Sequence, residues 1–369
     1  MSNTSTAVDF EVTIAGQKIE NNEVMAIIVD DDLNQPAMCV VTLRNKLNQY
    51  NGKYKAADTV EIKLGGGTRR SESGAGSGDK QTVFKGEVVG VECAYKQGGD
   101  HRLSVRAFTK MHRLLRGRKS KTWQDMSDQD VVSSIASECG LSAQCGSTPK
   151  ITHKHIYQHN QDNLSFIRVR AARLGFAVWC EDTKLFFDAP KLDADSGLEF
   201  VMDQQPKGGS GDKLKSFNGR LSTAQVLKKV TVRGWNPEKK EEVVGEAEPQ
   251  SSPLGSSNAA SGLGSFGTVQ TYVVDHPVMS VEEANAIAKA KLGEASMGYL
   301  TAEAEAMGNN KLKAGIVIKI KVNLDEASDR FNGKYLVAGV THRYTADNKG
   351  TEGGYSCFLR LARDAEKGS

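Results

Sequence analysis

The stretch QHNQDNLSFIRVRAARLG, residues 158–175, is the most strongly patterned run of this chain. Asn160 and Asp162 can each accept a hydrogen bond from the free N–H groups that begin a helix. Apolar residues then recur at helical spacing on one face, at Leu164, Ile167, Ala171 and Leu174. Because Gly175 can adopt the left-handed conformation that stops a helix, the stretch predicts a capped helix that ends there.

A hairpin and an earlier helix are predicted on either side of this helix. The runs Phe176–Trp179 and Leu185–Phe187 favour β-strands, and the polar residues 181–184 lie between them. A cap at Ser127 or Asp128, followed by apolar residues at helical spacing, predicts the earlier helix, which ends at Gly140. The patterned residues of this central unit are Gln158, Asn160, Asp162, Leu164, Phe166, Gly175 and Phe176.

The totals describe an ordinary globular protein. Of the 369 residues, 25% are charged and 38% are hydrophobic, which argues against disorder and is enough for several cores. The net charge of +3 requires no nucleic-acid partner, and the basic residues between Arg113 and Lys121 lack interleaved aromatics. No signal peptide and no membrane-spanning run is recognisable, so we expect synthesis in the bacterial cytoplasm.

β-favouring runs dominate both flanks of the central unit, between Phe10 and Phe108 and between Tyr299 and Leu361. The chain therefore predicts a β-rich α+β fold in three parts, residues 1–110, 111–220 and 221–369, with helices and a hairpin in the middle part. The first part has the size of a small barrel or sandwich. In the last part, residues 238–267 predict a flexible loop, and a capping box at Ser280 predicts a helix over about residues 280–293.

The last strands repeat the first. Lys55–Lys63 resembles Lys313–Lys321, Phe84–Gly86 resembles Phe331–Gly333, Gly90–Tyr95 resembles Gly339–Tyr344, and Leu103–Ala107 resembles Phe358–Ala362. The residues that mark the repeat are Phe84, Gly86, Gly90, Tyr95, Phe331, Gly333, Gly339 and Tyr344. The order is kept through all these elements, which indicates two copies of one β domain. Three such chains around an axis would form a ring with pseudo-sixfold symmetry.

With two related β domains around a helix-and-hairpin unit, the chain from about Asp9 to Arg363 resembles the late control D family of contractile-tail phages. Equivalent hub domains occur in the spike proteins of type VI secretion and of extracellular contractile injection particles. The resemblance implies a trimeric baseplate hub with two tube-like barrels in each chain. The implied partners are itself, a hexameric inner tube protein, a spike protein and other baseplate proteins. The sequence ends at Ser369, so either the spike is a separate protein or the chain is truncated.

The sequence offers few candidate sites for chemistry. His153, His155 and His159 are candidate metal ligands, but no Cys or carboxylate completes a set at familiar spacing, so polar strand histidines are favoured. Asp30-Asp31-Asp32 lacks the rest of a calcium loop and predicts a solvated turn. We expect no catalytic residue, no cofactor and a structural role; a tail-associated cell-wall hydrolase and a glycan-binding tail module are the alternatives.

Overall fold

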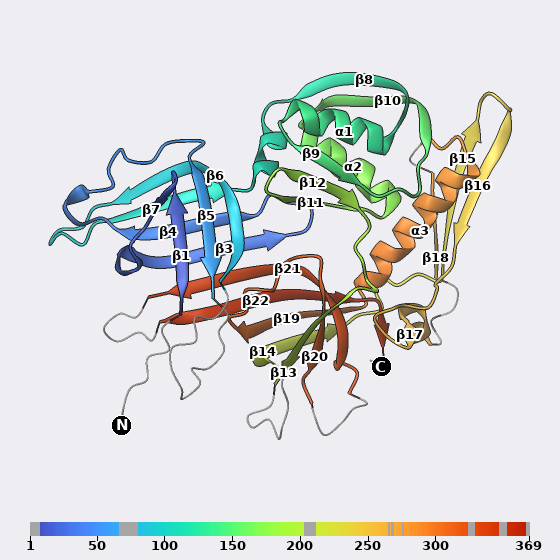
Figure 1. Cartoon of the computed structure of the whole chain (residues 1–369). Helices are drawn as coiled ribbons and strands as arrows, with labels where there is room; N and C mark the ends of the chain where they lie inside the picture. The colour runs from blue at the N-terminus through green and yellow to red at the C-terminus, as the bar shows by residue number, and fades with distance from the viewer. Residues whose placement is uncertain are drawn as a thin grey trace.

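The computed structural model describes residues 8–65, 80–202, 212–264, 266, 269–274, 277–323, 329–346 and 353–366. Four units are built from these residues: a first sheet, a barrel, a middle unit of helices and strands, and a side unit in which one helix covers a sheet (Figure 1). The predicted β-rich fold is confirmed.

The first sheet has the strand order β1–β5–β6–β7–β4–β3, and all neighbours in it are antiparallel. Its strands are β1 (Phe10–Ile14), β3 (Val24–Asp32), β4 (Met38–Arg44), β5 (Thr59–Leu64), β6 (Gln81–Ala94) and β7 (Arg102–Phe108), and the short β2 (Gln17–Lys18) extends the edge of β1. Successive side chains of a strand point to opposite faces of the sheet. In β4, the alternate residues Cys39, Val41 and Leu43 are all buried, so their face of the sheet is the one that packs against the core.

The barrel has the strand order β21–β20–β13–β14–β19–β22 and closes where β22 pairs back with β21. Its strands are β13 (Asp195–Val201), β14 (Asp212–Leu221), β19 (Leu300–Met307), β20 (Val317–Lys321), β21 (Gly333–Thr345) and β22 (Gly354–Arg363). The barrel interior is a packed core of apolar side chains, and β13 and β14 pair only at Phe200–Asp212 and Val201–Lys213.

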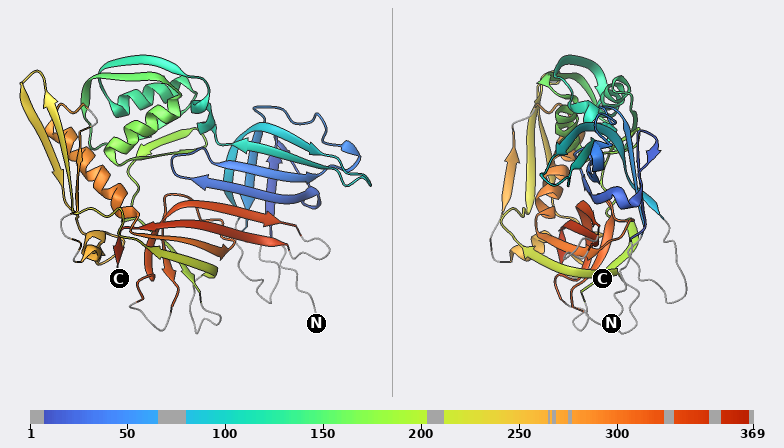
Figure 2. Two further views of the ribbon diagram at one scale, coloured as in Figure 1. Left: turned by 180° about the vertical axis from the view of Figure 1, so that it is seen from behind. Right: turned by 90° about the vertical axis from the view of Figure 1, so that its left-hand side faces the viewer.

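One long strand joins the first sheet to the barrel. The first half of β21 pairs with β20 of the barrel, and its second half pairs antiparallel with β3, from Gly339 opposite Asp32 to Thr345 opposite Ala26. The result is a continuous 13-stranded sheet with one shared hydrophobic cluster. The two views in Figure 2 agree that the blue and red strands lie side by side.

The middle unit has its own core. Helices α1 (Asp128–Glu138) and α2 (Asn163–Leu174) lie between a β8–β10 ribbon and a three-stranded sheet of order β11–β12–β9 (Figure 1). The remaining elements are η3 (Lys110–Leu115), β8 (Lys119–Ser127), β9 (Ser142–Cys145), β10 (Thr152–Gln161), β11 (Ala177–Glu181) and β12 (Lys184–Asp188). Both predicted helices and the predicted hairpin are therefore confirmed.

The side unit consists of α3 (Val281–Met297) packed on a sheet of order β16–β15–β18, which projects from the end of the molecule in Figure 1. Its strands are β15 (Lys229–Asn236), β16 (Glu241–Ala247) and β18 (Gln270–Val273). The helix approaches closely because Gly245 has no side chain on the face that it covers, and Gly234 leaves room for Val278, just before the helix. Short elements connect this unit to the barrel: β17 (Ser257–Asn258), η4 (Ala259–Leu263) and β23 (Ala365–Glu366).

Two sequence predictions about segments were wrong. Residues 238–267 are not one flexible loop: β16 lies there, with Val243 buried against α3, although residues 265 and 267 lie outside the described ranges. The charged composition of this strand hid its alternation. Moreover, β13 and β14 belong to the barrel, so the core of the middle unit ends near Phe187 rather than at residue 220.

The internal repeat is visible in the strand order. Each strand of the first sheet corresponds to one of the barrel in the same order, β1–β5–β6–β7–β4–β3 against β13–β20–β21–β22–β19–β14. The irregularities correspond too: the register between β6 and β7 shifts at Gly90, and that between β21 and β22 shifts at Gly339. Since a bulge is a specific local feature, its recurrence at one place indicates duplication. One difference is that β1 pairs antiparallel with β5, whereas β13 pairs parallel with β20.

Two of the aligned pairs in the repeat are out of register. Gly90 corresponds to Gly339 and Tyr95 to Tyr344, as predicted. With Gly90 aligned to Gly339, Gly86 corresponds to Tyr335 rather than to Gly333. In the same alignment, Phe84 corresponds to Gly333 rather than to Phe331. In the last strand, Arg106 corresponds to Arg360, one position away from the predicted match. A slip of one residue would turn each buried side chain of that strand outward.

Candidate functional site

The junction of β3 and β21 is the first candidate site, and we call residues 26–32 and 339–345 the seam. The three aspartates predicted as a solvated turn lie in β3 instead. Asp30 accepts a hydrogen bond from Thr341 Oγ1 at 2.7 Å, Asp31 accepts one from the Ala314 amide at 2.9 Å, and Asp32 pairs with Arg360. Burial raises the pKa of the Asp31 carboxyl. The aspartates thus fasten two halves of the chain, which no local sequence signal indicated.

The patterned residues of the middle unit serve its local structure. Asp162 caps α2 by accepting a hydrogen bond from the Ser165 amide at 2.8 Å, and Gly175 ends the helix in the left-handed conformation. Asn160 lies in β10 at a positive φ and caps nothing, contrary to expectation. The buried Gln158 donates to the Gln161 carbonyl, and Leu164, Phe166 and Phe176 lie in the core.

The three candidate histidines do not converge. His155 and His159 are exposed on β10 on either side of Tyr157, whereas His153 is largely buried. Within the ranges that the structure describes, no group of three or more His, Cys, Asp or Glu side chains could hold a metal ion.

His153 instead belongs to a buried charge cluster between the middle unit and the side unit, formed by Asp128, His153, Arg170, Arg173 and Glu283. His153 Nε2 lies 3.2 Å from Asp128 Oδ2, and Nδ1 lies 3.6 Å from Glu283 Oε1. Arg170 pairs with Asp128, and Arg173 donates to Glu283 at 2.6 Å. Burial opposes ionisation of Asp128, but the hydrogen bond with His153 and the charge of Arg170 lower its pKa. The residues are far apart in sequence, so only the fold brings them together.

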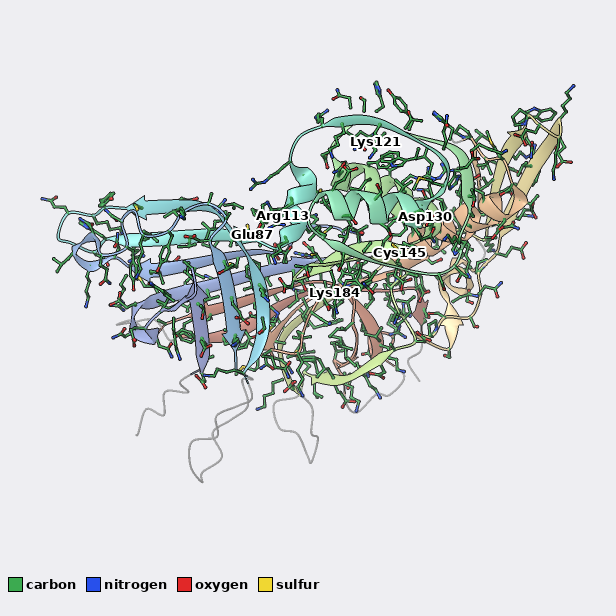
Figure 3. The ribbon with its side chains drawn as sticks, turned by 45° about the horizontal axis from the view of Figure 1, so that its top comes forward. Glu87, Arg113, Lys121, Asp130, Cys145 and Lys184 are labelled. Carbon is green, nitrogen blue, oxygen red and sulfur yellow. The ribbon has the colours of Figure 1, made fainter. Side chains whose placement is uncertain are left out.

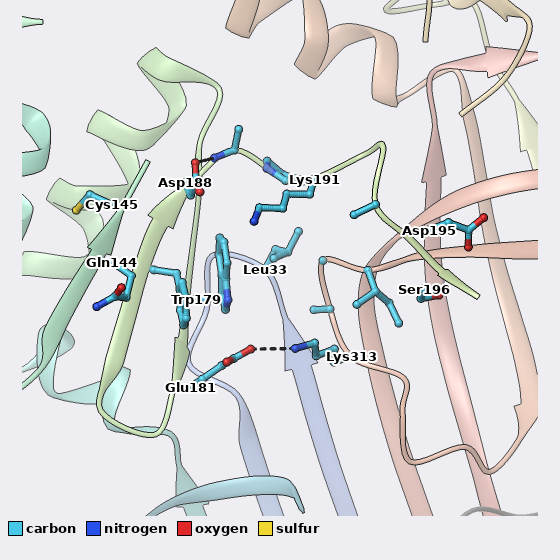
Figure 4. Close-up of a pocket in the computed structure, with 17 residues that line it drawn as sticks. Leu33, Gln144, Cys145, Trp179, Glu181, Asp188, Lys191, Asp195, Ser196 and Lys313 are labelled. Carbon is cyan, nitrogen blue, oxygen red and sulfur yellow. Dashed lines mark hydrogen bonds and ion pairs between the residues drawn. The ribbon is translucent and has the colours of Figure 1, made fainter. Parts of the chain in front are cut away.

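A pocket of about 580 Å³ lies between the middle unit and the barrel (Figure 4). Trp179 and Phe186 stack in it, with ring centroids 4.9 Å apart and an interplanar angle of 2°. Gln144 is the cross-strand neighbour of Phe186, and Lys313 of the barrel side forms an ion pair with Glu181 at 3.0 Å. The volume is in the range of small-molecule sites. Sequence reasoning found the hairpin but not this pocket, since its other wall comes from residues 313–316.

A model of one protein family, described as the Alg8 N-terminal domain, matches residues 4–346. The chain belongs to the Alg8 N-terminal domain family. No curated protein sequence matches this Alg8 N-terminal domain chain.

Several solved structures share its fold. A 43 kDa tail protein of prophage MuSo2 from Shewanella oneidensis has a TM-score of 0.68 at 12% identity, over 98% of this chain and 100% of that one. A tail protein from Neisseria meningitidis MC58 also has a TM-score of 0.68 at 12% identity, over 97% of each chain.

A third similar structure is an E. coli component of the type VI secretion system, described as similar to the phage T4 tail proteins gp27 and gp5. It has a TM-score of 0.56 at 13% identity, over 97% of this chain and 78% of that one. The Alg8 N-terminal domain chain therefore has a phage tail-type fold. No described helix is long and apolar enough to cross a membrane.

Proposed function

We propose that this protein is the central structural hub of a contractile injection machine, a phage tail baseplate or a related particle. Three chains form a ring that joins the hexameric inner tube to the trimeric spike, and other baseplate proteins bind around it. The first sheet and the barrel act as tube-like domains in this ring. The role requires no catalysis and no cofactor, and synthesis takes place in the bacterial cytoplasm.

The observation that carries this proposal is the duplication. One chain holds two sheets of matching strand order, joined edge to edge at the seam. A threefold arrangement of such chains presents six similar sheets, so a single protein can match a sixfold partner on one side and a threefold partner on the other. The phage tail-type fold is consistent with this role.

Mass measurement with and without the tube protein tests the proposal. We expect a trimer, and we expect electron microscopy to place it between tube and spike. A chain that stays monomeric at high concentration and with tube protein present would overturn the hub. Because a hydrolase would clear peptidoglycan in a zymogram, clearing by the purified chain would overturn the non-catalytic role.

The pocket favours one second candidate, a glycan-binding tail module. A flat apolar surface is formed by the stacked rings of Trp179 and Phe186, and the side-chain amide of the neighbouring Gln144 can form hydrogen bonds beside it. An aromatic face next to a hydrogen-bonding group can bind a sugar. Glycan binding that is lost in Trp179→Ala, in a chain that does not assemble, would favour this candidate over the hub.

A further inference from the structure

The duplication leaves one strand pairing without its counterpart. In the barrel, the second half of β21 carries β3 along its outer edge, from Gly339 to Thr345. In the first sheet, the corresponding half of β6, residues 90–94, pairs with β7 on one side only, and no described strand pairs with its other edge. The strand that corresponds to β3 is β14, which pairs with β13 only at Asp212 and Lys213. β19 pairs with one edge of β14, and among the described residues the opposite edge has no strand partner from Ser216 to Leu221.

We propose that β6 of one chain pairs antiparallel with β14 of a neighbouring chain, and so repeats the seam between chains. This inference rests on the proposed hub and names the surface through which its copies join. The two strands belong to different units of one chain, β6 to the first sheet and β14 to the barrel (Figure 1). The contact is therefore head-to-tail, which closes into a ring when the rotation between copies permits.

The matching bulges fix the register of this pairing. Gly90 corresponds to Gly339, and the shared register shift at the start of β3 and β14 makes Ala26 correspond to Ser216. Since Gly339 lies opposite Asp32 in the seam, Gly90 lies opposite Ser222 between chains. The further pairs are Val91 with Leu221, Glu92 with Arg220, Cys93 with Gly219, Ala94 with Asn218, and Tyr95 with Phe217.

Side-chain chemistry agrees with this register. Glu92 lies opposite Arg220, so opposite charges meet where Thr341 and Asp30 share a hydrogen bond in the seam. On the other face, apolar residues meet, Val91 with Leu221 and Tyr95 with Phe217.

The exposed fractions of Val91 and Tyr95 show that the open edge of β6 lacks a covering partner. Val91 is 38% exposed, whereas its counterpart Val340, which β3 covers, is 0% exposed. Tyr95 is 59% exposed in the single chain. Unpaired edges with exposed apolar residues are the feature that strand addition covers.

A charge exchange tests the pairing. We expect Glu92→Arg and Arg220→Glu each to weaken association of the full chain about tenfold or more, because each places like charges opposite one another on adjacent strands. The double variant E92R/R220E restores the pair between chains and recovers association, because the exposed ion pair of Glu92 with Arg106 of its own chain contributes little to stability. Glu242→Arg, an equal charge reversal at an exposed ion pair of the side unit, is the matched control and leaves the mass unchanged. Circular dichroism checks that each variant folds.

Cross-linking tests the register independently. Ala94→Cys with Asn218→Cys is expected to give disulfide-linked oligomers, whereas Ala94→Cys with Ser222→Cys, displaced along β14, gives few. Suppose that the wild type is a trimer, that both charge-reversed variants are trimers as well, and that the Ala94→Cys and Asn218→Cys pair does not cross-link. This result would overturn the pairing of β6 with β14 but would leave the proposed hub intact. A wild-type chain that stays monomeric with tube protein present and shows no cross-link overturns both.

Discussion

Arg113 donates from both Nε and Nη2 to the carboxylate of Glu87, and so fastens η3 of the middle unit to β6 of the first sheet (Figure 3). The Nε hydrogen bond is 3.1 Å long, and His112 Nε2 lies 3.1 Å from the same carboxylate oxygen. This contact orients the middle unit on the first sheet.

Arg113→Ala should lower the free energy of unfolding by about 2–3 kcal/mol, because the largely buried Glu87 carboxylate would lose its main partner. Denaturant unfolding measures this value. Lys150→Ala, which removes an exposed pair with Asp130, should cost less than about 1 kcal/mol. Equal effects of the two substitutions would contradict the role of Arg113.

Acid should weaken the same contact. The hydrogen bond from Arg113 lowers the pKa of Glu87 below its ordinary value of 4.5. The folded carboxyl therefore binds its proton less readily than the unfolded one, so its stabilisation is present above pH 4.5 and is lost as the pH falls below it. Denaturant midpoints below pH 4.5 should fall less steeply in Glu87→Gln than in the wild type.

His342 should add a second pH dependence at higher pH. Burial lowers its pKa from 6.5 to about 4, and its ring contacts Tyr355 Oη at 2.7 Å and the Leu312 carbonyl at 3.1 Å. Since the unfolded chain binds the proton first, stability is lost as the pH falls from 6.5 to about 4, by at most about 1.4 kcal/mol per pH unit. His342→Gln should reduce the pH dependence of the free energy of unfolding between pH 6.5 and about 4, and an unchanged dependence would contradict this role of His342.

Two glycines of the side unit should respond in opposite directions to alanine. Gly245→Ala would push a methyl group into the backbone of α3 at Ala284, which should cost about 1–3 kcal/mol. Gly293→Ala, at an exposed position inside α3 with nothing within 4 Å, should stabilise the protein by about 0.5–1 kcal/mol. Thermal unfolding measures whether each variant is more or less stable than the wild type. Stabilisation by Gly245→Ala would contradict the close packing of α3.

The charge cluster should hold α3 against the middle unit. Arg173→Ala removes the guanidinium that pairs with the buried Glu283 carboxylate, and we expect a loss of about 2–4 kcal/mol and faster proteolysis near α3. Lys291→Ala removes an exposed pair on the same helix and is the control. Similar proteolysis of both variants would show that apolar packing alone holds α3.

Local patterns predicted α1, α2, α3 and the strands of strong alternation, because caps and apolar spacing are encoded within a few residues. The alignment of Gly90 with Gly339 was also readable, since a glycine stands at the register shift of each strand. By contrast, β16 carries glutamates on its exposed positions, and β13 and β14 pair with strands distant in sequence. The seam, the charge cluster and the pocket depend on such distant pairings, so their residues carry no local signal.

The seam also sets an order of events during synthesis. β3 (Val24–Asp32) is synthesised long before its partner β21 (Gly333–Thr345) leaves the ribosome. Contacts between such distant segments form late in folding. A chain that has not yet synthesised β21 therefore carries an open β3 edge and an unclosed barrel, so the seam forms only after β21 has left the ribosome.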